Sequence, residues 1–382
     1  MYNVLTLNKI AAVGTSRLGD NYSYGDDVQN PDAILVRSAA MHDMEFESNL
    51  LAIARAGAGT NNIPKDKCSE QGIVVFNTPG ANANAVKELV ITGLLMSSRK
   101  IVEGIEWAKT LKGNGDAVGK MVEKGKSQFV GPEIKGKTLG VIGLGAIGIL
   151  VANAAVALGM DVIGFDPFMS VTNALKLDPA VKLMKNNEEV MTNCDYLTIH
   201  VPLTPDTKDL VDADMIAKMK DGVRIMNFSR DGLVNSTAVL EAVKSGKVAK
   251  YVTDFGTDDI LGEENIICMP HLGASTPESE DNCAVMACDQ VKEYLENGNI
   301  INSVNYPAIS LPRSGDTRFC VMHKNVPELL KNVLAELNGN VENMLSKSRG
   351  DYAYTIIDVA GADKADADKI SAVDGVIRVR AL

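Results

Sequence analysis

The sequence predicts an α/β protein built on parallel β-sheets and ending in a small βαββαβ domain. Short apolar runs alternate with longer segments of helical periodicity from Asp32 onward, an order typical of parallel strands joined by crossover helices. The runs are apolar almost throughout, as in AILV at 33–36 and DVIGFD at 161–166, which is the composition of strands covered by helices on both faces. At 382 residues the chain is too long for one ordinary hydrophobic core, so we expect two or three domains.

The strands and helices of the parallel sheets are expected in two groups. The first group has strands near residues 33–36, 51–57 and 73–77, followed by a helical pattern at 83–99. The strand rhythm resumes with apolar runs at 139–143, 161–166, 196–202, 224–229, 251–255 and 266–270.

The C-terminal region is expected to form a domain separate from the parallel sheets. Residues 305–316 contain two prolines and a glycine, so this segment predicts a linker. The pattern after it predicts a ferredoxin-like sheet with strand 318–322, helix 327–337, strands 341–346 and 352–359, helix 362–372 and strand 376–381.

Composition excludes several classes of partner. The formal net charge is −11, from 38 Lys and Arg against 49 Asp and Glu, and it repels nucleic acid and anionic membranes. The six cysteines have no spacing suited to zinc, so we expect reduced thiols and no metal. Residues 1–10 do not resemble a secretory signal, which predicts a cytoplasmic location. The uncharged stretch 138–160 is long enough to span a membrane, but its glycines divide it into a strand, a turn and a helix.

A glycine-rich turn predicts a dinucleotide site. The pattern GxGxxG follows a predicted strand and opens an alanine-rich helix, with Gly143, Gly145 and Gly148 as its glycines and Ala146 and Ile147 inside the turn. Glycines permit the tight turn and the approach of a pyrophosphate, and the helix N-terminus offers N–H groups to phosphate. Asp166 ends the next strand, where its carboxylate would bind the ribose hydroxyls. With no Arg or Lys at 167–171 to bind a further phosphate, the sequence favours NAD over NADP.

Polar residues just past predicted strand ends are the catalytic candidates. Oxidation of a hydroxylated carbon needs a base for the hydroxyl proton, a cation for the substrate and a hydride acceptor nearby. Arg230 follows the run at 224–229, and His271 follows the run at 266–270 and opens a tight loop. Open α/β sheets bind ligands at such ends. Three acidic residues crowd the end of the run at 251–255, namely Asp254, Asp258 and Asp259.

Five motifs resemble those of the D-2-hydroxyacid dehydrogenases and occur in the same order over nearly the whole chain. They are NTPGAN (77–82), HVPLTPDT (200–207), NFSRDGLV (227–234), PHLGAST (270–276) and NSVNYP (302–307). The last is similar to the form found in the phosphoglycerate dehydrogenase branch. The resemblance implies NAD-dependent oxidation of 3-phosphoglycerate to 3-phosphohydroxypyruvate, the first step of L-serine biosynthesis.

The resemblance also assigns roles in catalysis. It implies that His271 is the acid–base residue and that Arg230 binds the substrate carboxylate and carbonyl oxygen. The family's glutamate that orients the histidine has Asp258 as its nearest equivalent, one methylene shorter, with Asp254 and Asp259 as alternatives. Asp254 also corresponds to the family's aspartate near the nicotinamide carboxamide. Further NAD contacts are expected at His200, as a wall of the pocket, and at Pro202, Thr207 and Gly273.

The family's domain pattern places a substrate-binding domain at 1–95 and 286–305, the NAD-binding Rossmann domain at 96–285 and an ACT-like regulatory domain at 316–382. Substrate contacts are then expected at Arg37, Ser38, Ala56, Gly57 and Lys126. The C-terminal pattern resembles the ACT domain found at the end of many phosphoglycerate dehydrogenases, where serine binds at a domain–domain interface, and the positions that contact serine correspond to His323, Asn325 and Asn340. The resemblance thus predicts L-serine as an effector and a homo-oligomer as the assembly.

Other interpretations stay open. The chain could be another D-2-hydroxyacid dehydrogenase, such as a glyoxylate or hydroxypyruvate reductase, or a serine sensor with weak catalysis because Asp258 replaces glutamate. The C-terminal domain could serve only to stabilise an oligomer, and Arg37 could be an ordinary surface charge.

Overall fold

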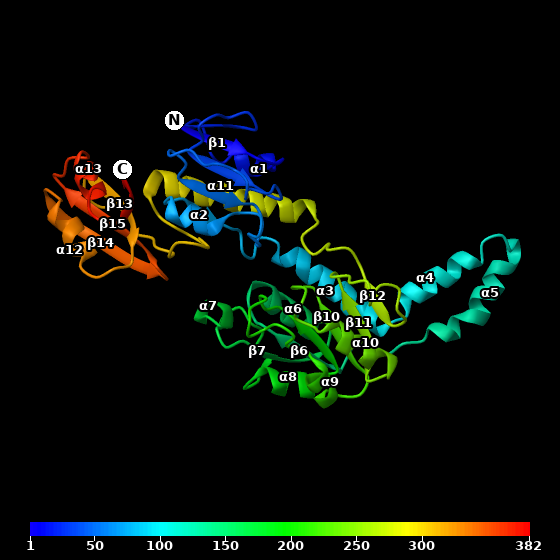
Figure 1. The fold of residues 1–382 in the computed structure, drawn as a ribbon. Helices are drawn as coiled ribbons and strands as arrows, with labels where there is room; N and C mark the ends of the chain where they lie inside the picture. Colours follow the sequence, from blue (N-terminus) through cyan, green and yellow to red (C-terminus); the bar gives the residue numbers. More distant parts are fainter. The chain divides into compact units, whose positions relative to one another are not determined.

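The computed structural model describes residues 1–382, which form two compact units. One comprises Met1–Asn82 with Pro277–Leu382, and the other comprises Ala83–Thr276. The chain passes between the units at the first residues of two long helices, α3 (Ala83–Ser98) and α11 (Pro277–Asn297), rather than near residues 95 and 286. Each unit contains one parallel sheet (Figure 1).

The parallel sheet of the first unit has five strands in the order β2-β1-β3-β4-β5. The strands are β1 (Tyr2–Thr6), β2 (Tyr22–Gly25), β3 (Ala33–Val36), β4 (Ala52–Arg55) and β5 (Val74–Phe76), and the short helices are α1 (Ala12–Thr15) and α2 (Lys65–Glu70). Alternate residues of β3 and β4 face opposite sides, as the period of a strand requires. Leu35 and Ala54 belong to the core under α11, whereas Ile34 and Ile53 belong to the core that includes Cys68 of α2.

The C-terminal region forms a four-stranded antiparallel sheet in the order β14-β15-β13-β16. Its elements have the predicted βαββαβ order: β13 (Thr317–Lys324), α12 (Leu329–Ala335), β14 (Asn340–Arg349), β15 (Tyr352–Ala360), α13 (Asp366–Ser371) and β16 (Val376–Ala381). One face packs against the two helices through Phe319 and Ile357. The other face joins the core of the five-stranded sheet through Met322 and Ile356.

Residues 305–316 are not a free linker. Tyr306, Ile309 and Leu311 are buried in the shared core, and Ile300 forms an antiparallel bridge with Ile309. The prolines of this segment indicated a linker, but the apolar residues between them pack instead. The C-terminal sheet is therefore an integral part of the first unit.

The second unit has a seven-stranded parallel sheet in the order β12-β11-β10-β9-β6-β7-β8. Its strands are β6 (Thr138–Ile142), β7 (Asp161–Phe165), β8 (Lys182–Leu183), β9 (Tyr196–Ile199), β10 (Val223–Asn227), β11 (Val248–Thr253) and β12 (Ile266–Cys268). The order reverses between β6 and β9, which is the crevice where doubly wound sheets bind dinucleotides.

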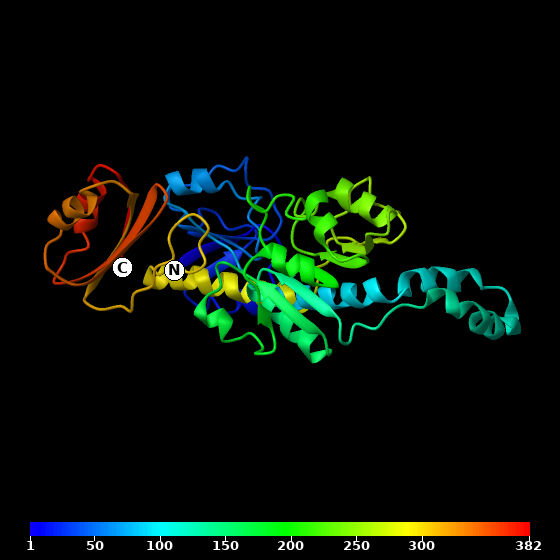
Figure 2. The ribbon, with the colours of Figure 1, turned by 90° about the horizontal axis from the view of Figure 1, so that it is seen from below.

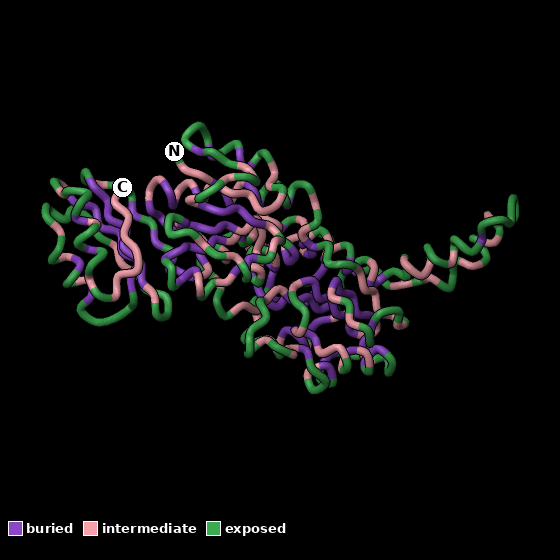
Figure 3. Tube along the Cα trace, turned by 45° about the horizontal axis from the view of Figure 1, so that its top comes forward, coloured by how far each residue is buried: buried purple, intermediate pink, exposed green.

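Helices cover both faces of this sheet, as the continuous apolar runs predicted. Helix α3 and helix α6 (Ala146–Ala157) enclose one core. On the other face, the second core is enclosed by α8 (Asn187–Asn193), α9 (Ala213–Lys218) and α10 (Ser236–Lys244). Figure 3 shows the strands between these layers as buried. The short helix α7 (Val171–Ala174) has no buried residue.

A helical arm extends from the second unit (Figures 1 and 2). It consists of α4 (Ile101–Thr110), the 3-10 turn η1 (Gly115–Ala117), α5 (Val118–Gly125) and the 3-10 turn η2 (Lys126–Phe129). Neither α4 nor α5 contains a buried residue. No helix of the structure combines the length and the apolar character needed to cross a membrane.

Candidate active site

The glycine-rich turn connects β6 to α6 at the point where the strand order reverses. Gly143 has a positive φ of 88°, and a Cβ there would lie 2.5 Å from the carbonyl oxygen of His200. A Cβ at Gly148 would overlap the Gly143 carbonyl, whereas one at Gly145 would meet nothing within 4 Å. The first and third glycines are therefore required by packing, and the second faces open space.

The N-terminus of α6 has the features of a phosphate site. Gly145 is its N-cap and supplies no side-chain hydrogen bond, so the first amides of the helix are available to an anion. These amides belong to Ala146, Ile147 and Gly148. The open space at Gly145 and the uncapped amides fit the pyrophosphate of a dinucleotide.

Asp166 follows β7 beside this turn. Its Oδ2 accepts a hydrogen bond from Leu144 N at 2.9 Å, and its Oδ1 accepts one from Phe168 N at 2.8 Å. Each carboxylate oxygen has a second acceptor position, so the side chain is held by the backbone and can still accept hydrogen bonds from ribose hydroxyls.

His200 lies at the end of β9 and packs behind the glycine turn. Its Nε2 is 3.0 Å from Thr198 Oγ1, and its buried Nδ1 has no hydrogen-bond partner. Burial lowers the pKa of His200 to about 3, so the ring is neutral near pH 7. The backbone carbonyl of His200 lies against the glycine turn, and the role of the neutral ring as a wall of the cofactor pocket stays a prediction.

We expect His200 to weaken the fold as the pH falls. The pKa of His200 is about 3 in the folded chain and about 6.5 in an unfolded chain, so only the unfolded state gains a proton between these values. Stability is then complete above pH 6.5 and decreases by up to about 1.4 kcal/mol per pH unit below it. Urea unfolding at pH 7 and pH 5 should show a smaller loss in His200→Gln than in the parent. The same loss in both would contradict the assignment, and His42→Gln is the control at an exposed histidine.

Pro202 and Thr207 form a closed loop after β9. Thr207 Oγ1 donates to Pro202 O at 2.6 Å and accepts from Thr204 N at 2.8 Å. The hydroxyl of Thr207 is therefore used within the loop. Pro202 is exposed and Thr207 is half-buried.

His271 and Asp254 lie together at the carboxyl ends of β12 and β11. The ring of His271 contacts Phe255 edge to face, with centroids 4.9 Å apart. Asp254 is only 3% exposed, and neither of its carboxylate oxygens has a hydrogen-bond partner. Burial raises the pKa of Asp254. The charge of His271, the backbone amides of Gly273 and of Asp254 itself, and the charge of Arg230 oppose this rise. A buried carboxylate thus stands within the electrostatic reach of both catalytic candidates.

The structure does not bring Asp258 to His271. Asp258 is exposed and forms no hydrogen bond or ion pair, while Asp259 is held by Thr257 Oγ1. The carboxylate of Asp258 therefore lies in solvent. Of the three candidate carboxylates, only Asp254 is buried beside the histidine. Gly273 is also buried there, and a Cβ at this position would lie 3.7 Å from Asp254 Oδ2.

Arg230 is exposed after β10, where its guanidinium can reach a ligand. Its backbone carbonyl accepts a hydrogen bond from Asn227 Nδ2 at 2.9 Å, and its Nη1 donates to Ser229 O at 2.6 Å. Asn227 is buried and was missed by the sequence analysis, although it opens the motif that contains Arg230. It fixes the backbone from which the guanidinium extends.

The predicted substrate residues of the first unit lie in two loops. Arg37 and Ser38 follow β3, and Asn8 Oδ1 accepts hydrogen bonds from the backbone amides of Arg37, Ser38 and Ala39 at 2.9–3.1 Å. Arg37 Nη2 forms an ion pair with Glu280 Oε1 at 2.6 Å. Asn8 carries no sequence signal for this role, because it is 29 residues from the loop that it holds.

The amides of Ala56 and Gly57 are already occupied. Ala56 N donates to Val36 O and Gly57 N donates to Arg55 O, so neither amide is free for a ligand, and the expectation that Ala56 and Gly57 contact substrate stays a prediction. The amides of Ala58, Gly59 and Thr60 form no hydrogen bond.

Lys126 belongs to the other unit, at the start of η2 on the arm. It forms an ion pair with Glu123 one helical turn earlier. A cation with its own partner on an exposed helix is typical of a solvated surface.

The three predicted serine contacts do not converge within the chain. His323 is buried, with Nε2 2.9 Å from Thr355 Oγ1 and Nδ1 2.8 Å from Lys324 O. Asn325 Nδ2 donates to Gly350 O near the same end of the sheet. Asn340 pairs with Ala360 whereas His323 pairs with Ala353, which separates them by about 23 Å at roughly 3.3 Å per strand residue. Serine binding by one chain is therefore not supported, and L-serine as an effector stays a prediction.

The cofactor turn and the histidine–carboxylate pair define a dehydrogenase on a doubly wound sheet, and the comparisons give its family. The model of the NAD-binding domain of D-isomer specific 2-hydroxyacid dehydrogenases matches residues 91–273. A D-3-phosphoglycerate dehydrogenase of Haemophilus influenzae is 31% identical over 355 residues, covering 89% of this chain and 83% of its own. The chain belongs to the D-2-hydroxyacid dehydrogenase family and is an NAD-dependent dehydrogenase.

Other relatives carry the same name. D-3-phosphoglycerate dehydrogenase 1 of Saccharomyces cerevisiae is 29% identical, and the alignment covers 90% of this chain and 76% of the yeast protein. The enzyme of Methanocaldococcus jannaschii is 32% identical over 84% of this chain, but this chain spans only 60% of its length.

Solved structures share the fold at lower identity. The 3-phosphoglycerate dehydrogenase of Entamoeba histolytica with bound NAD⁺ is 24% identical, with a TM-score of 0.60 over 80% of this chain and 98% of that one. D-mandelate dehydrogenase of Rhodotorula graminis is 21% identical, with a TM-score of 0.68 over 82% and 99%. At sequence identities below 25%, the likeness to these structures shows that the chain shares their fold.

Proposed function

We propose that the chain oxidises 3-phosphoglycerate at C2 with NAD and produces 3-phosphohydroxypyruvate, the first step of L-serine biosynthesis. The observation that carries the proposal is the placement of His271, Asp254 and Arg230 at the carboxyl ends of neighbouring strands in the sheet that bears the cofactor turn. The relatives named D-3-phosphoglycerate dehydrogenases support the choice of substrate.

The chain's own residues account for the proton and for the carboxylate. NAD supplies the hydride acceptor when it is bound. His271 accepts the proton of the C2 hydroxyl, so loss of a hydride and a proton together leaves a carbonyl. Arg230 binds the carboxylate and the carbonyl oxygen with charge-assisted hydrogen bonds. The α6 amides hold the pyrophosphate, and Asp166 holds the ribose.

Asp254 is proposed to orient His271 in this reaction. It is a buried carboxylate without a hydrogen-bond partner, and a protonated imidazole would supply the opposite charge. A carboxylate of this kind stabilises the imidazolium that forms as the base takes its proton. We assign the role to Asp254 rather than Asp258 because Asp258 lies in solvent.

The proposal is tested by NADH fluorescence with a panel of substrates. The purified chain should reduce NAD with 3-phosphoglycerate at a higher kcat/KM than with D-glycerate, and it should oxidise NADH with 3-phosphohydroxypyruvate. A higher kcat/KM for glyoxylate or unphosphorylated hydroxypyruvate would assign the chain to the reductases of the same family. No turnover with any member would favour a protein that only senses ligands.

Arg37 is expected to bind the substrate phosphate after release from Glu280. An exposed ion pair contributes about 0.2–1 kcal/mol, which is less than a charge-assisted bond to phosphate contributes. Arg37→Ala should raise the KM for 3-phosphoglycerate at least about tenfold and change that for D-glycerate much less. Glu280→Gln should lower the KM for 3-phosphoglycerate, because it frees Arg37 and removes a negative charge. Equal effects of Arg37→Ala on both substrates would exclude a phosphate role.

The assembly is proposed to be a homo-oligomer in which a second copy covers the arm. Ile101 and Ile105 of α4 are 45% and 52% exposed, and exposed apolar residues clustered on helices without a core mark an interaction surface. Ile105→Glu should reduce the molar mass measured by size-exclusion chromatography with light scattering. Leu175→Glu, at an exposed leucine outside the arm, should leave it unchanged. A parent chain that elutes as a monomer would contradict the proposal.

A further inference from the structure

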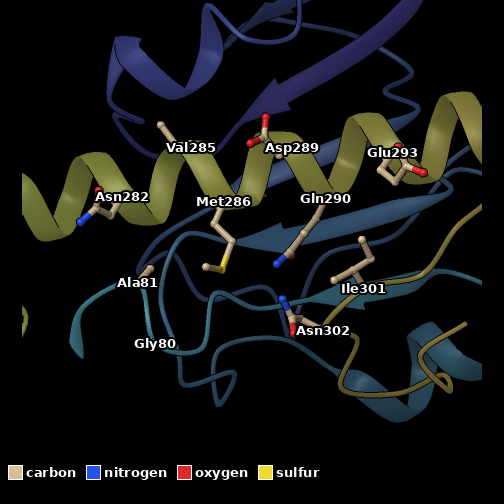
Figure 4. A pocket seen from close by; sticks show the side chains of 10 residues that line it. All are labelled: Gly80, Ala81, Asn282, Val285, Met286, Asp289, Gln290, Glu293, Ile301 and Asn302. Atoms are coloured by element: carbon tan, nitrogen blue, oxygen red, sulfur yellow. The ribbon is translucent and has the colours of Figure 1, made fainter. Parts of the chain in front are cut away.

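A cavity of about 650 Å³ lies within the first unit (Figure 4). One wall is a face of α11, and the opposite wall is formed by residues 80–81 and 301–302. None of the residues assigned above to catalysis, NAD or substrate lines it. The proposed reaction therefore leaves this cavity without a function.

An unpaired amide is directed into the cavity. Gln290 is 4% exposed, and neither its Oε1 nor its Nε2 has a hydrogen-bond partner. Figure 4 shows its side chain extending from α11 toward the residues of the opposite wall. A buried amide without partners is destabilising, so a ligand that pairs with both atoms would remove that penalty.

The charge of the lining excludes anions. Asp289 and Glu293 lie on the same face of α11, and no Lys, Arg or His lines the cavity. Asp289 forms an ion pair with Arg17 at 2.6 Å on the exposed side of the helix. Glu293 accepts hydrogen bonds only from neutral amides, those of Asn297 and Asn299, so its negative charge is not neutralised. Phosphorylated and carboxylate ligands are repelled, including the proposed substrate and the dinucleotide.

Five of the other lining residues are apolar or small, and the last two are Asn282 and Asn302. Val285 and Met286 come from α11, Ile301 comes from the opposite wall, and Gly80 and Ala81 leave room between them. A small-molecule site commonly combines such apolar walls with a few polar groups that fix orientation. Here the neutral polar groups are Asn282, Asn302 and Gln290. Of these, Gln290 is the buried one whose donor and acceptor are both unpaired.

We propose that this cavity binds a small uncharged molecule that carries a primary carboxamide on an apolar body. The ligand carbonyl accepts a hydrogen bond from Gln290 Nε2, and the ligand N–H donates to Gln290 Oε1. The apolar body contacts Met286 and Ile301. The site is independent of the reaction proposed above, because it shares no residue with it.

Benzamide and benzoate are matched probes that differ in charge and in the donor. Binding is measured on the full chain by calorimetry and ligand-observed NMR, with saturating NADH present to fill the dinucleotide site. Benzamide should bind, and benzoate should bind at least about tenfold more weakly, a difference of about 1.4 kcal/mol. Absence of benzamide binding, or equal affinity for both probes, would overturn the proposal.

Two variants locate the binding. Gln290→Leu keeps the volume and removes the amide, so it should fold and should weaken benzamide at least about tenfold, with turnover unchanged. Gln29→Leu, at an exposed glutamine, is the control and should leave affinity unchanged. Ile301→Trp fills the cavity from its partly exposed side and should also abolish binding. Benzamide affinity that survives both cavity variants would place the molecule elsewhere and refute the site.

Discussion

His271→Gln is expected to lower kcat by about 10²–10⁴, the usual contribution of a general acid–base group. Glutamine has a similar length and can donate a hydrogen bond, but it cannot take the hydroxyl proton. The contact of His271 with Phe255 is made at an exposed loop, so the substitution should not disturb the core. Turnover of 3-phosphoglycerate is measured under saturating NAD.

The control measurements separate chemistry from folding and cofactor binding. Far-UV circular dichroism and NADH binding should match the parent, because no residue of the glycine turn touches His271. His42→Gln removes an exposed histidine in the first unit and should retain full activity. If kcat of His271→Gln stays within about threefold of the parent, another group is the base.

The parallel sheets were predictable because burial on both faces leaves a continuous apolar run. The strand Ala33–Val36 and the helix beginning at Ala83 fall where the sequence placed them. The cofactor turn was equally predictable, because nearby backbone atoms leave no room for a Cβ at Gly143 or Gly148. The positive φ of Gly143 and the contact of Gly148 with the Gly143 carbonyl arise within the turn itself, and a motif can predict such local features.

The shared core of the first unit was not predictable from local pattern. Strand β13 is buried on both faces except at Lys324. Its apolar composition indicates burial on both faces, but it does not indicate which element covers the second face. The structure shows that Arg380 donates to the carbonyls of Tyr294 and Leu295 at the end of α11. Buried Arg318 donates to Asn297 O and pairs with Asp358. These contacts join residues that are at least 21 positions apart.

The carboxylate beside His271 shows where motif transfer fails. The family pattern placed the orienting carboxylate a few residues after Asp254, and this chain has one residue fewer there. Spacing alone could not show that Asp258 is exposed. The buried and unpaired state of Asp254 is a tertiary property, since Arg230, His271 and Gly273 come from other segments.

Comparison of Asp254→Asn with Asp258→Asn is expected to show which carboxylate supports the base. Asp254→Asn should lower kcat at least about tenfold, because loss of the charge removes stabilisation of the imidazolium, and loss of such a carboxylate costs about 10⁴ in the serine protease triad. Asp258→Asn should stay within about threefold, since that side chain lies in solvent and exposed substitutions have small effects.

Two further readouts distinguish orientation from a structural role. In Asp254→Asn the kcat for 3-phosphoglycerate should fall while its KM stays close to that of the parent, because the carboxylate is proposed to act on the base and not on the substrate. Burial raises the pKa of Asp254, which means that its charge is unfavourable in the folded chain, so the neutral asparagine should leave the melting temperature unchanged or higher. A variant that is less active yet no less stable is the expected signature of a functional carboxylate. If Asp258→Asn is the more damaging substitution, or if Asp254→Asn loses activity only by unfolding, the orienting role does not belong to Asp254.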